Sequence, residues 1–539
     1  MIVNITQRNN NATPDVIRAL ADIKAAGAGE LHFEKGEYHF FKAGSTKEFF
    51  AVSNNSACDK NIVFPVLGME NVTVDGHGSV FVFHEIVFPF MVSKNQNVTL
   101  KNFVIDTGMS PLVNFTLHGF TDDGFYMDVD KAESPFYIEN GSINFKRESN
   151  VWYGKEHLLS LHAIGRHQVQ YLATGKENTV NTANLPAPLM KCDVIETPSG
   201  IYAKYHEDTP SRCNFGNERI SAIIDGGRNV DVICLDRSEQ VFITNVTVAR
   251  GIGMGVIAQL SKNIYIDSFS TDTSYHGFGH QTLTADALHF VNCDGDLEIK
   301  NCKISDTMDD AINVHGMYTE VYGCDELGLK AEIKHKEQHF FNPYRPGDRL
   351  EIIDNKTLDV VAELLVESAG FVNGSGTELL IKGGFTYGAD RVKNGYLIEN
   401  PDRMPDLHLH HNEFRNFPHN RISGAGRIVV EKNSFSGCHC ALLCFDLAHY
   451  WYESGRVKNL VYQNNVLSNC DITGGMSFIM IGVNGAPNEN TPRIHKRVQI
   501  TNNRFLDVTG SILKSGGVQE LVFEDNEFEC APEGSVQIF

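Results

Sequence analysis

Short β-prone runs that end in Asn-x-Phe, or a close variant of it, recur along this chain and constrain its fold more than any other feature. Near the C-terminus these runs contain Asn412, Asn433, Asn503 and Asn526. The first two asparagines are 21 residues apart, and the last two are 23 apart. Repeats of this length are typical of solenoids, in which each coil buries its inner face only against its neighbours. The pattern therefore predicts an all-β protein built as a right-handed parallel β-helix.

Weaker copies of the same pattern continue toward the N-terminus. They comprise Val72–Gly76, Val98–Phe103, Val241–Val246, Ile264–Phe269 and Leu297–Cys302. Alternating residues of each run are expected to face the core. The asparagines are expected to take the left-handed or bridging turn between strands and to hydrogen-bond the asparagine of the next coil.

The open end of such a solenoid needs a cap, and the residues from Thr13 onward predict one. Thr13 and Pro14 match the N-cap and the first position of a helix. The apolar residues that follow form one stripe at helical spacing: Val16, Ile17, Leu20 and Ile23. We expect an amphipathic helix that covers the apolar end of the first coil.

Two stretches break the rhythm and predict β-rich, barrel-like insertions. The second contains short alternating strands such as Arg349–Ile353, with a Gly-Ser-Gly turn at 374–376. Insertions of this kind often flank the binding face of a solenoid. The predicted organisation is an N-terminal cap with the first coils at 1–112, an insertion at 113–230, central coils at 231–322, a second insertion at 323–404, and C-terminal coils at 405–539.

Charge and composition bound the partners of the protein. The 539 residues carry a formal net charge of −21 and show no basic run, so neither nucleic acid nor an anionic membrane is an expected partner. A neutral ligand fits such a surface best. The N-terminus lacks the features of a signal peptide, which predicts a protein that is cytoplasmic or whose leader has been removed. The oligomeric state does not follow from the sequence.

Two clusters of potential metal ligands have simpler explanations. Cys438–Cys440 with Cys444 lack a second ligand pair, so we expect small apolar side chains stacked within a coil rather than a zinc site. His408, His410 and His411 lie on one predicted strand, whose alternation points only two of them the same way. A solvated strand face is the expected arrangement, and no metal or other cofactor is predicted.

The chemistry-bearing part of the chain is a run of carboxylates. Asp286 precedes Asp309 and Asp310 by 23 and 24 residues, about one coil, so the three are expected on neighbouring strands and are the candidate catalytic residues. Glycoside hydrolysis needs such a group, because one carboxylic acid protonates the leaving oxygen and another carboxylate activates water. Adjacent residues of a regular strand point to opposite faces, so Asp309 and Asp310 require a local bend to reach one site.

Polar residues accompany these carboxylates. Asn313 and His315 lie at alternate positions of one run and should share a face, and His289 follows Asp286 by three residues. The carboxylates are flanked by small apolar residues, which would partly desolvate them and raise the pKa of a catalytic acid.

The order of these residues resembles known families. Asp286, Asp309-Asp310 and His315-Gly316 are similar to the pattern of polygalacturonase-type hydrolases, but Met317–Glu320 stand where those enzymes carry an Arg-x-Lys for uronic acids. The chain more closely resembles the glycoside hydrolase family of exo-acting α-1,3-galactosidases. The segments that carry this resemblance are Gly253–Gln259, Asp286–Phe290, Asp309–Gly316 and Trp451–Gly455.

This resemblance implies an inverting exo-glycosidase that removes terminal α-1,3-linked galactose from a galactose-terminated glycan, without a metal. It implies Asp309 as the general acid, and Asp286 and Asp310 as the residues that position and deprotonate water. The candidates for substrate binding are His315, Asn313, His289, Asp446, Tyr452, Glu453 and Arg421. A surface ion pair is an alternative for Arg421, and packing of a loop is one for the aromatic residues beside Glu453.

Two other functions fit the same carboxylates. A polysaccharide lyase would use Asp286, Asp309 and Asp310 to hold Ca²⁺, and a non-catalytic carbohydrate-binding β-helix would use them only for recognition. Release of galactose in the presence of a chelator would exclude the lyase, and loss of turnover in Asp309→Asn would exclude the binding module. The sequence does not choose among branched blood-group-type, linear α-galactosyl and algal glycans.

Overall fold

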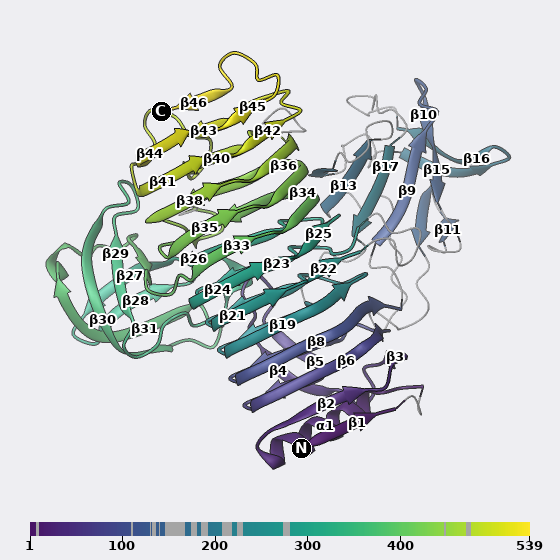
Figure 1. The fold of residues 1–539 in the computed structure, drawn as a ribbon, viewed down its shortest axis with the longest axis horizontal. Helices are drawn as coiled ribbons and strands as arrows, with labels where there is room; N and C mark the ends of the chain where they lie inside the picture. The colour runs from purple at the N-terminus through teal and green to yellow at the C-terminus, as the bar shows by residue number, and fades with distance from the viewer. Residues whose placement is uncertain are drawn as a thin grey trace.

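The structure is a computed structural model in which the strands stack into a solenoid with the two termini at opposite ends (Figure 1). It describes residues 1–6, 10–108, 112–129, 131, 136–139, 141–145, 168–173, 180–184, 192–206, 218–223, 230–272, 281–446, 449–470 and 476–539. Of the described strands, 31 join in one hydrogen-bonded array, and strands of successive coils pair in parallel. The predicted right-handed parallel β-helix is confirmed. Within this part of the chain, no helix is long and apolar enough to cross a membrane.

The predicted N-terminal helix is present as α1 (Thr13–Ala26) and packs on the first coils (Figure 1). Its most deeply buried apolar side chains are Val16, Ala19, Leu20 and Ile23. The prediction that Thr13 is the N-cap is wrong by one residue, because Ala12 takes that position without a side-chain cap. The Thr13 hydroxyl instead donates to the carbonyl of Phe41 at 2.9 Å, so it ties the helix to the first coil.

One face of the solenoid carries the candidate catalytic residues, and we call it the site sheet. Its strands, from one coil to the next, are β7 (Phe88–Ser93), β18 (Ile233–Asp236), β20 (Val256–Gln259), β23 (Leu288–Val291), β26 (Ile312–Met317), and the C-terminal halves of β34 (Glu413–Ile422) and β36 (Ser434–Asp446). Inward side chains such as Leu288 and Val314 belong to one continuous apolar core. The alternate side chains point away from that core, so they form ladders on the outer face.

Asparagines of successive C-terminal coils form a hydrogen-bonded ladder, as the repeats predicted. The ladder consists of Asn412, Asn433, Asn465, Asn503 and Asn526. From Asn433 onward, each Oδ1 accepts from the backbone N–H and from the Nδ2 of the asparagine one coil earlier, at 2.9–3.1 Å. The left-handed conformation falls on the preceding residue in these coils, such as Lys432 with φ 56°, whereas an asparagine such as Asn102 with φ 60° adopts it in the N-terminal coils.

Both insertions contain β-sheets, and they project from different sides of the solenoid (Figure 1). The second contains a closed barrel with its own apolar core, between β26 and β33 (Asp406–His410). The barrel strands, in order around the barrel, are β27 (Thr319–Asp325), β28 (Gly328–Glu332), β31 (Glu378–Tyr387), β30 (Val360–Phe371), β29 (Arg349–Ile353) and β32 (Leu397–Glu399).

The first insertion contributes a seven-stranded antiparallel sheet, although much of 113–230 lies outside the described residues. Its strands, in sheet order, are β14 (Val180–Asn184), β13 (Gln168–Ala173), β17 (Glu218–Ile223), β9 (Leu112–His118), β10 (Gly124–Val129), β16 (Gly200–Tyr205) and β15 (Cys192–Thr197).

Two of the three cysteines near residue 440, Cys438 and Cys444, pack in the solenoid core, as predicted, and Cys440 lies in a separate apolar cluster. Cys438, Cys440 and Cys444 are fully buried. The Sγ atom of Cys438 lies 3.0 Å from that of Cys470, which is its register partner one coil later. Burial raises the pKa of the Cys444 thiol well above its usual value, so it stays protonated. These side chains therefore behave as small apolar groups.

Candidate active site

Asp286 and Asp310 stand at equivalent positions of neighbouring coils. In the parallel pair β23–β26, Leu288 lies opposite Ile312, and each aspartate precedes its member of that pair by two residues. The backbone N–H of Ala287 donates to the carbonyl of Asp310 at 2.9 Å, which continues the register beyond the strands. Both side chains belong to largely buried residues, 3% and 7% exposed. The spacing read from the sequence therefore places the two aspartates on adjacent rungs.

The bend that the Asp309-Asp310 pair required is present. Residues 308 and 309 form a bend, and β26 begins only after them. Asp309 is half-buried, and its Oδ1 accepts a hydrogen bond from the N–H of Asp310 at 3.2 Å. The irregular backbone releases both residues from strand alternation, so adjacent carboxylates do not have to point to opposite faces.

His289, Asn313 and Arg421 occupy consecutive rungs of one ladder on the outer face of the site sheet. His315 stands two residues after Asn313 and shares its side, as predicted. Asn313 is 5% exposed, and its Oδ1 has no hydrogen-bond partner among the described residues. A buried acceptor without a partner destabilises a fold unless water or a ligand satisfies it, so this position suits a sugar hydroxyl.

A hydrogen-bonded chain runs from Asp286 through two histidines. Oδ2 of Asp286 lies 2.7 Å from Nδ1 of His289, and the Nε2 atoms of His289 and His315 are 2.9 Å apart. Nδ1 of His315 lies 2.6 Å from the carbonyl of Gly316. Burial, with the charges of His289 and Arg421, holds the pKa of His315 well below its usual value, so its ring is neutral near pH 7.

The partners along this chain locate its protons. Because a carbonyl only accepts, His315 donates to it from Nδ1, and its Nε2 must accept from the Nε2–H of His289. The remaining hydrogen bond, between His289 Nδ1 and Asp286, needs one proton on either the imidazole or the carboxyl group. The Asp286–His289 pair therefore shares a single proton, and Asp286 is ionised whenever His289 is an imidazolium.

Asp310 has a histidine partner of its own. Its Oδ1 lies 3.1 Å from Nδ1 of His419, whose side chain is 27% exposed. Burial lowers the pKa of His419, but the hydrogen bond and charge of Asp310, with the charge of Asp309, outweigh it and raise that pKa above its usual value. The pair is therefore an imidazolium beside a carboxylate over a wider pH range than a free histidine would allow.

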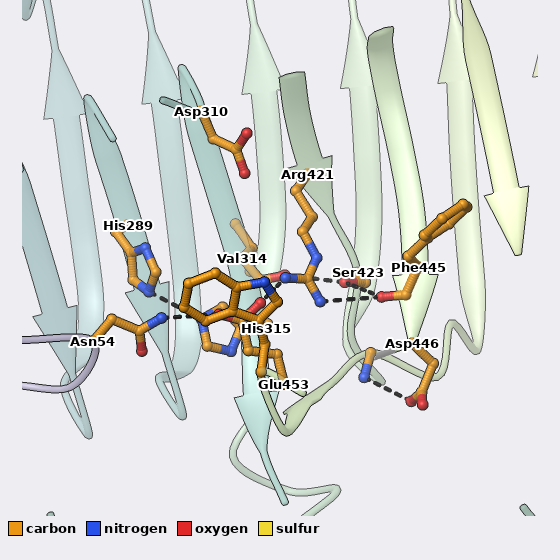
Figure 2. A network of polar contacts seen from close by, with 12 residues as sticks. Asn54, His289, Asp310, Val314, His315, Arg421, Ser423, Phe445, Asp446 and Glu453 are labelled. Carbon is orange, nitrogen blue, oxygen red and sulfur yellow. Dashed lines mark hydrogen bonds and ion pairs between the residues drawn. The ribbon is translucent and has the colours of Figure 1, made fainter. Parts of the chain in front are cut away.

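Arg421 and Glu453 form an ion pair that is almost completely buried, with side-chain exposures of 5% and 3%. Arg421 also donates to the carbonyl of Phe445, and Glu453 Oε1 accepts from Nδ2 of Asn54 at 2.9 Å. Figure 2 shows His289, on β23, and Asp310, just before β26, near this pair. Burial lowers the pKa of Arg421 to about 10, although nearby aspartates oppose the shift. The alternative of a surface ion pair for Arg421 is therefore wrong.

Asp446 and Tyr452 both contact Tyr318 or the apolar cluster around it, where the barrel meets the solenoid. Oδ2 of Asp446 accepts from the Tyr318 hydroxyl at 2.7 Å and from the backbone N–H of Gly455 at 3.0 Å. Burial raises the pKa of Asp446, although these hydrogen bonds oppose the shift. Tyr452 packs against the apolar cluster around Tyr318, where the barrel joins the solenoid. These contacts attach the segment that carries Glu453 to the barrel.

Two polar residues of this site escaped the sequence analysis. His419 lies one rung from Asp310, but it is 109 residues away in the chain because the barrel is inserted between them. Asn54 reaches Glu453 from a loop of the first coils, 399 residues away. His419 is two residues before Arg421, so correct alignment of the strand after the barrel would have found it. No local pattern marks Asn54.

The histidine partners of the carboxylates bear on metal binding. Calcium prefers oxygen ligands, whereas Asp286 and Asp310 each face an imidazole nitrogen. In the described residues, the histidine, cysteine and carboxylate groups whose ligand atoms converge are those of Glu298, His408 and His410, on a different sheet of the solenoid. Asp286 and Asp310 are thus placed to share or exchange protons with imidazoles.

The fold and this site define a parallel β-helix protein with a carboxylate-rich outer face. Over almost its whole length the chain is similar to proteins named alpha-1,3-galactosidase. The A form of Shewanella woodyi is 27% identical over 525 residues, which cover 96% of this chain and 83% of the relative. The B form of Bacteroides thetaiotaomicron is 25% identical over 535 residues, which cover 96% of this chain and 83% of that relative. The resemblance to α-1,3-galactosidases is confirmed.

The chain is also similar, at low sequence identity, to solved structures. The alignment with an exopolygalacturonase from Thermotoga maritima covers 98% of this chain and 92% of that protein, with a TM-score of 0.40 and 9% sequence identity. The alignment with a mannuronan C-5 epimerase A-module from Azotobacter vinelandii covers 98% of this chain and 95% of that module, with a TM-score of 0.38 and 8% sequence identity. No family model matches the chain.

Proposed function

We propose that this protein is an inverting exo-glycosidase that hydrolyses terminal, non-reducing α-1,3-linked galactose. The observation that carries the proposal is the placement of Asp286 and Asp310 on adjacent rungs, with Asp309 released by a bend beside them. Glycoside hydrolysis requires two carboxyl groups in different protonation states around one bond. The names of relatives similar along 96% of this chain support galactose as the sugar and the α-1,3 linkage.

In the proposed reaction, Asp309 donates a proton to the glycosidic oxygen while water attacks the anomeric carbon from the opposite face of the sugar. The C–O bond breaks, the remaining glycan leaves with a free hydroxyl, and β-galactose forms. A carboxylate takes the proton that water loses. Asp309 is the more accessible of the adjacent aspartates, which suits contact with a leaving group.

Asp286 and Asp310 act together on the water in this proposal. His419 balances the charge of Asp310 and supports its ionised form, which a base requires. Asp286 is ionised when the shared proton lies on His289, so this pair can orient the water without a net charge. The division of work between the two aspartates follows the resemblance and these partners.

Substrate recognition is assigned to the polar ladder. The Asn313 amide and the Arg421 guanidinium offer an acceptor and donors to the galactose hydroxyls, and Glu453 holds the guanidinium in place. The contact between Asn54 and Glu453 joins the first coils to the segment after β36 beside His315. A site closed by such a contact favours a chain end, which supports the exo-acting assignment.

The proposal is tested by incubating the protein with α-1,3-, α-1,4- and α-1,6-linked galactobioses in excess EDTA and separating the products. We expect free galactose from the α-1,3 isomer alone, and its release should be at least about 100-fold slower with Asp309→Asn. From a longer α-1,3-linked glycan, monosaccharide should be the sole small product. Galactose from the other linkages, release of internal oligosaccharides, or dependence on Ca²⁺ with an unsaturated product would refute it.

A further inference from the structure

A second cluster of potential ligands lies on another sheet of the solenoid. Its strands are β24 (Asp294–Lys300), β33 and β35 (Arg427–Glu431). Glu298 is the register partner of His408, and Glu431 is the register partner of His410. The two imidazoles of β33 thus lie between a carboxylate of β24 on one side and a carboxylate of β35 on the other.

The ligand atoms of this cluster converge diagonally. Glu298 Oε1 lies 3.3 Å from His410 Nε2, and Glu431 Oε1 lies 3.3 Å from His408 Nε2. The two imidazole rings are 4.0 Å apart between centroids. One ligand atom from each of Glu298, His408 and His410 lies within 4.8 Å of the others. Small side-chain rotations would bring such atoms to the roughly 2.0–2.2 Å bonds that Zn²⁺ makes with nitrogen and oxygen.

Each carboxylate is oriented by a partner outside the cluster. Lys300 Nζ lies 3.0 Å from Oε2 of Glu298, and Gln463 Nε2 donates to Oε2 of Glu431 at 2.8 Å. The other oxygen of each carboxylate is therefore the one that faces an imidazole. Outer partners that fix ligand orientation in this way are characteristic of metal sites.

We propose that Glu298, His408, His410 and Glu431 bind one borderline divalent transition-metal ion, with Zn²⁺ as the natural choice for two nitrogen and two oxygen donors. The ion would link three neighbouring coils, which contain β24, β33 and β35. The first of these coils is separated from the other two in the sequence by the inserted barrel. Glu298 lies 112 residues before His410, and Glu431 lies 23 residues after His408. Because both carboxylates are distant in the sequence, the histidines alone suggested a solvated strand face.

The test uses the full, untagged chain with the exposed Cys324 and Cys530 changed to serine, so that accessible thiols do not compete for the metal. Isothermal titration with Zn²⁺ alone should show one site per chain, and Zn²⁺ should raise the melting temperature until EDTA is added. His410→Ala and Glu298→Gln should each weaken binding at least about tenfold, because each removes a ligand.

The matched control is His32→Ala, which removes a half-buried histidine that faces a single carboxylate, Glu30, elsewhere on the solenoid. It should bind Zn²⁺ like the reference protein. Galactosidase activity should be the same in all these variants, because the cluster shares no residue with the site sheet. The proposal is overturned if the reference protein takes up no Zn²⁺, or if His410→Ala and Glu298→Gln bind it as tightly as His32→Ala does.

Discussion

The ion pair between Arg421 and Glu453 offers a direct test of whether the site sheet trades stability for binding. Burial lowers the pKa of Arg421 from 12.5 to about 10. Since one pKa unit corresponds to about 1.4 kcal/mol, the buried guanidinium is disfavoured by about 3 kcal/mol relative to its state in water. Both side chains are at most 5% exposed, so solvent does little to relieve that penalty. The pair is therefore expected to be retained for function.

Three variants separate the pair from its parts. Glu453→Gln keeps a hydrogen-bond acceptor for Asn54 but leaves the Arg421 guanidinium without its ion-pair partner. Arg421→Met leaves the Glu453 carboxylate without its partner. Each single change should lower the free energy of unfolding by about 3–5 kcal/mol. The double variant lacks both charges of the pair and should lie within about 1 kcal/mol of the wild type, or above it. All three should lose most galactosidase activity.

Urea unfolding followed by far-ultraviolet circular dichroism gives these differences, and hydrolysis of α-1,3-galactobiose gives the activities. Arg403→Met is the control, because it removes a largely buried guanidinium, 16% exposed, whose partners Asp348 and Asp294 lie outside the site sheet. It should lower stability and leave turnover intact. A double variant as unstable as the sum of the two single changes, or an active double variant, would refute the reasoning.

Three further changes probe other parts of the structure. Asp309→Asn should slow hydrolysis of α-1,3-galactobiose by about 10²–10⁴-fold, but slow dinitrophenyl α-galactoside far less, because that leaving group needs no proton; initial rates on both substrates decide. The raised pKa of His419 makes its pair with Asp310 fully stabilising below pH 6.5, and the contribution is lost as pH rises through that raised value. Urea unfolding should therefore show the stability gap between wild type and His419→Gln shrinking as the pH rises above 6.5, and a constant gap would contradict this. Asn465→Ala removes hydrogen bonds on both sides of its rung and should lower the urea midpoint by an amount equivalent to about 1–3 kcal/mol.

Much of the fold was predictable because a parallel solenoid repeats one local rule. The Asn-x-Phe spacing gave the coil length, and the ladder through Asn412 and Asn433 confirms its hydrogen bonding. Asn465 was hidden because its coil lacks the phenylalanine that marks the others. The cap helix was correct, but its first residue was not, because the Thr13 hydroxyl found a partner across the first coil. Local patterns do not contain that partner.

The site was predictable where its residues lie on consecutive coils without an insertion. Asp286 and Asp310 are 24 residues apart, so their register followed from coil length alone. His419 lies on the rung after Asp310, but the barrel displaces it by 109 residues in sequence. Asn54 depends on the path of a distant loop. The Asn54 contact is set by tertiary packing, so only the structure reveals it.

The stereochemistry of hydrolysis tests the central claim most directly. Proton NMR of the methyl glycoside of α-1,3-galactobiose, whose leaving group is a methyl galactoside, is recorded in the first minutes after the enzyme is added. It distinguishes the two anomers of the released galactose before they interconvert. The proposed roles of Asp286, Asp309 and Asp310 predict that β-galactose appears first and that the α anomer grows in only by mutarotation. Initial release of α-galactose would mean a covalent intermediate on one of these carboxylates, and it would contradict the account.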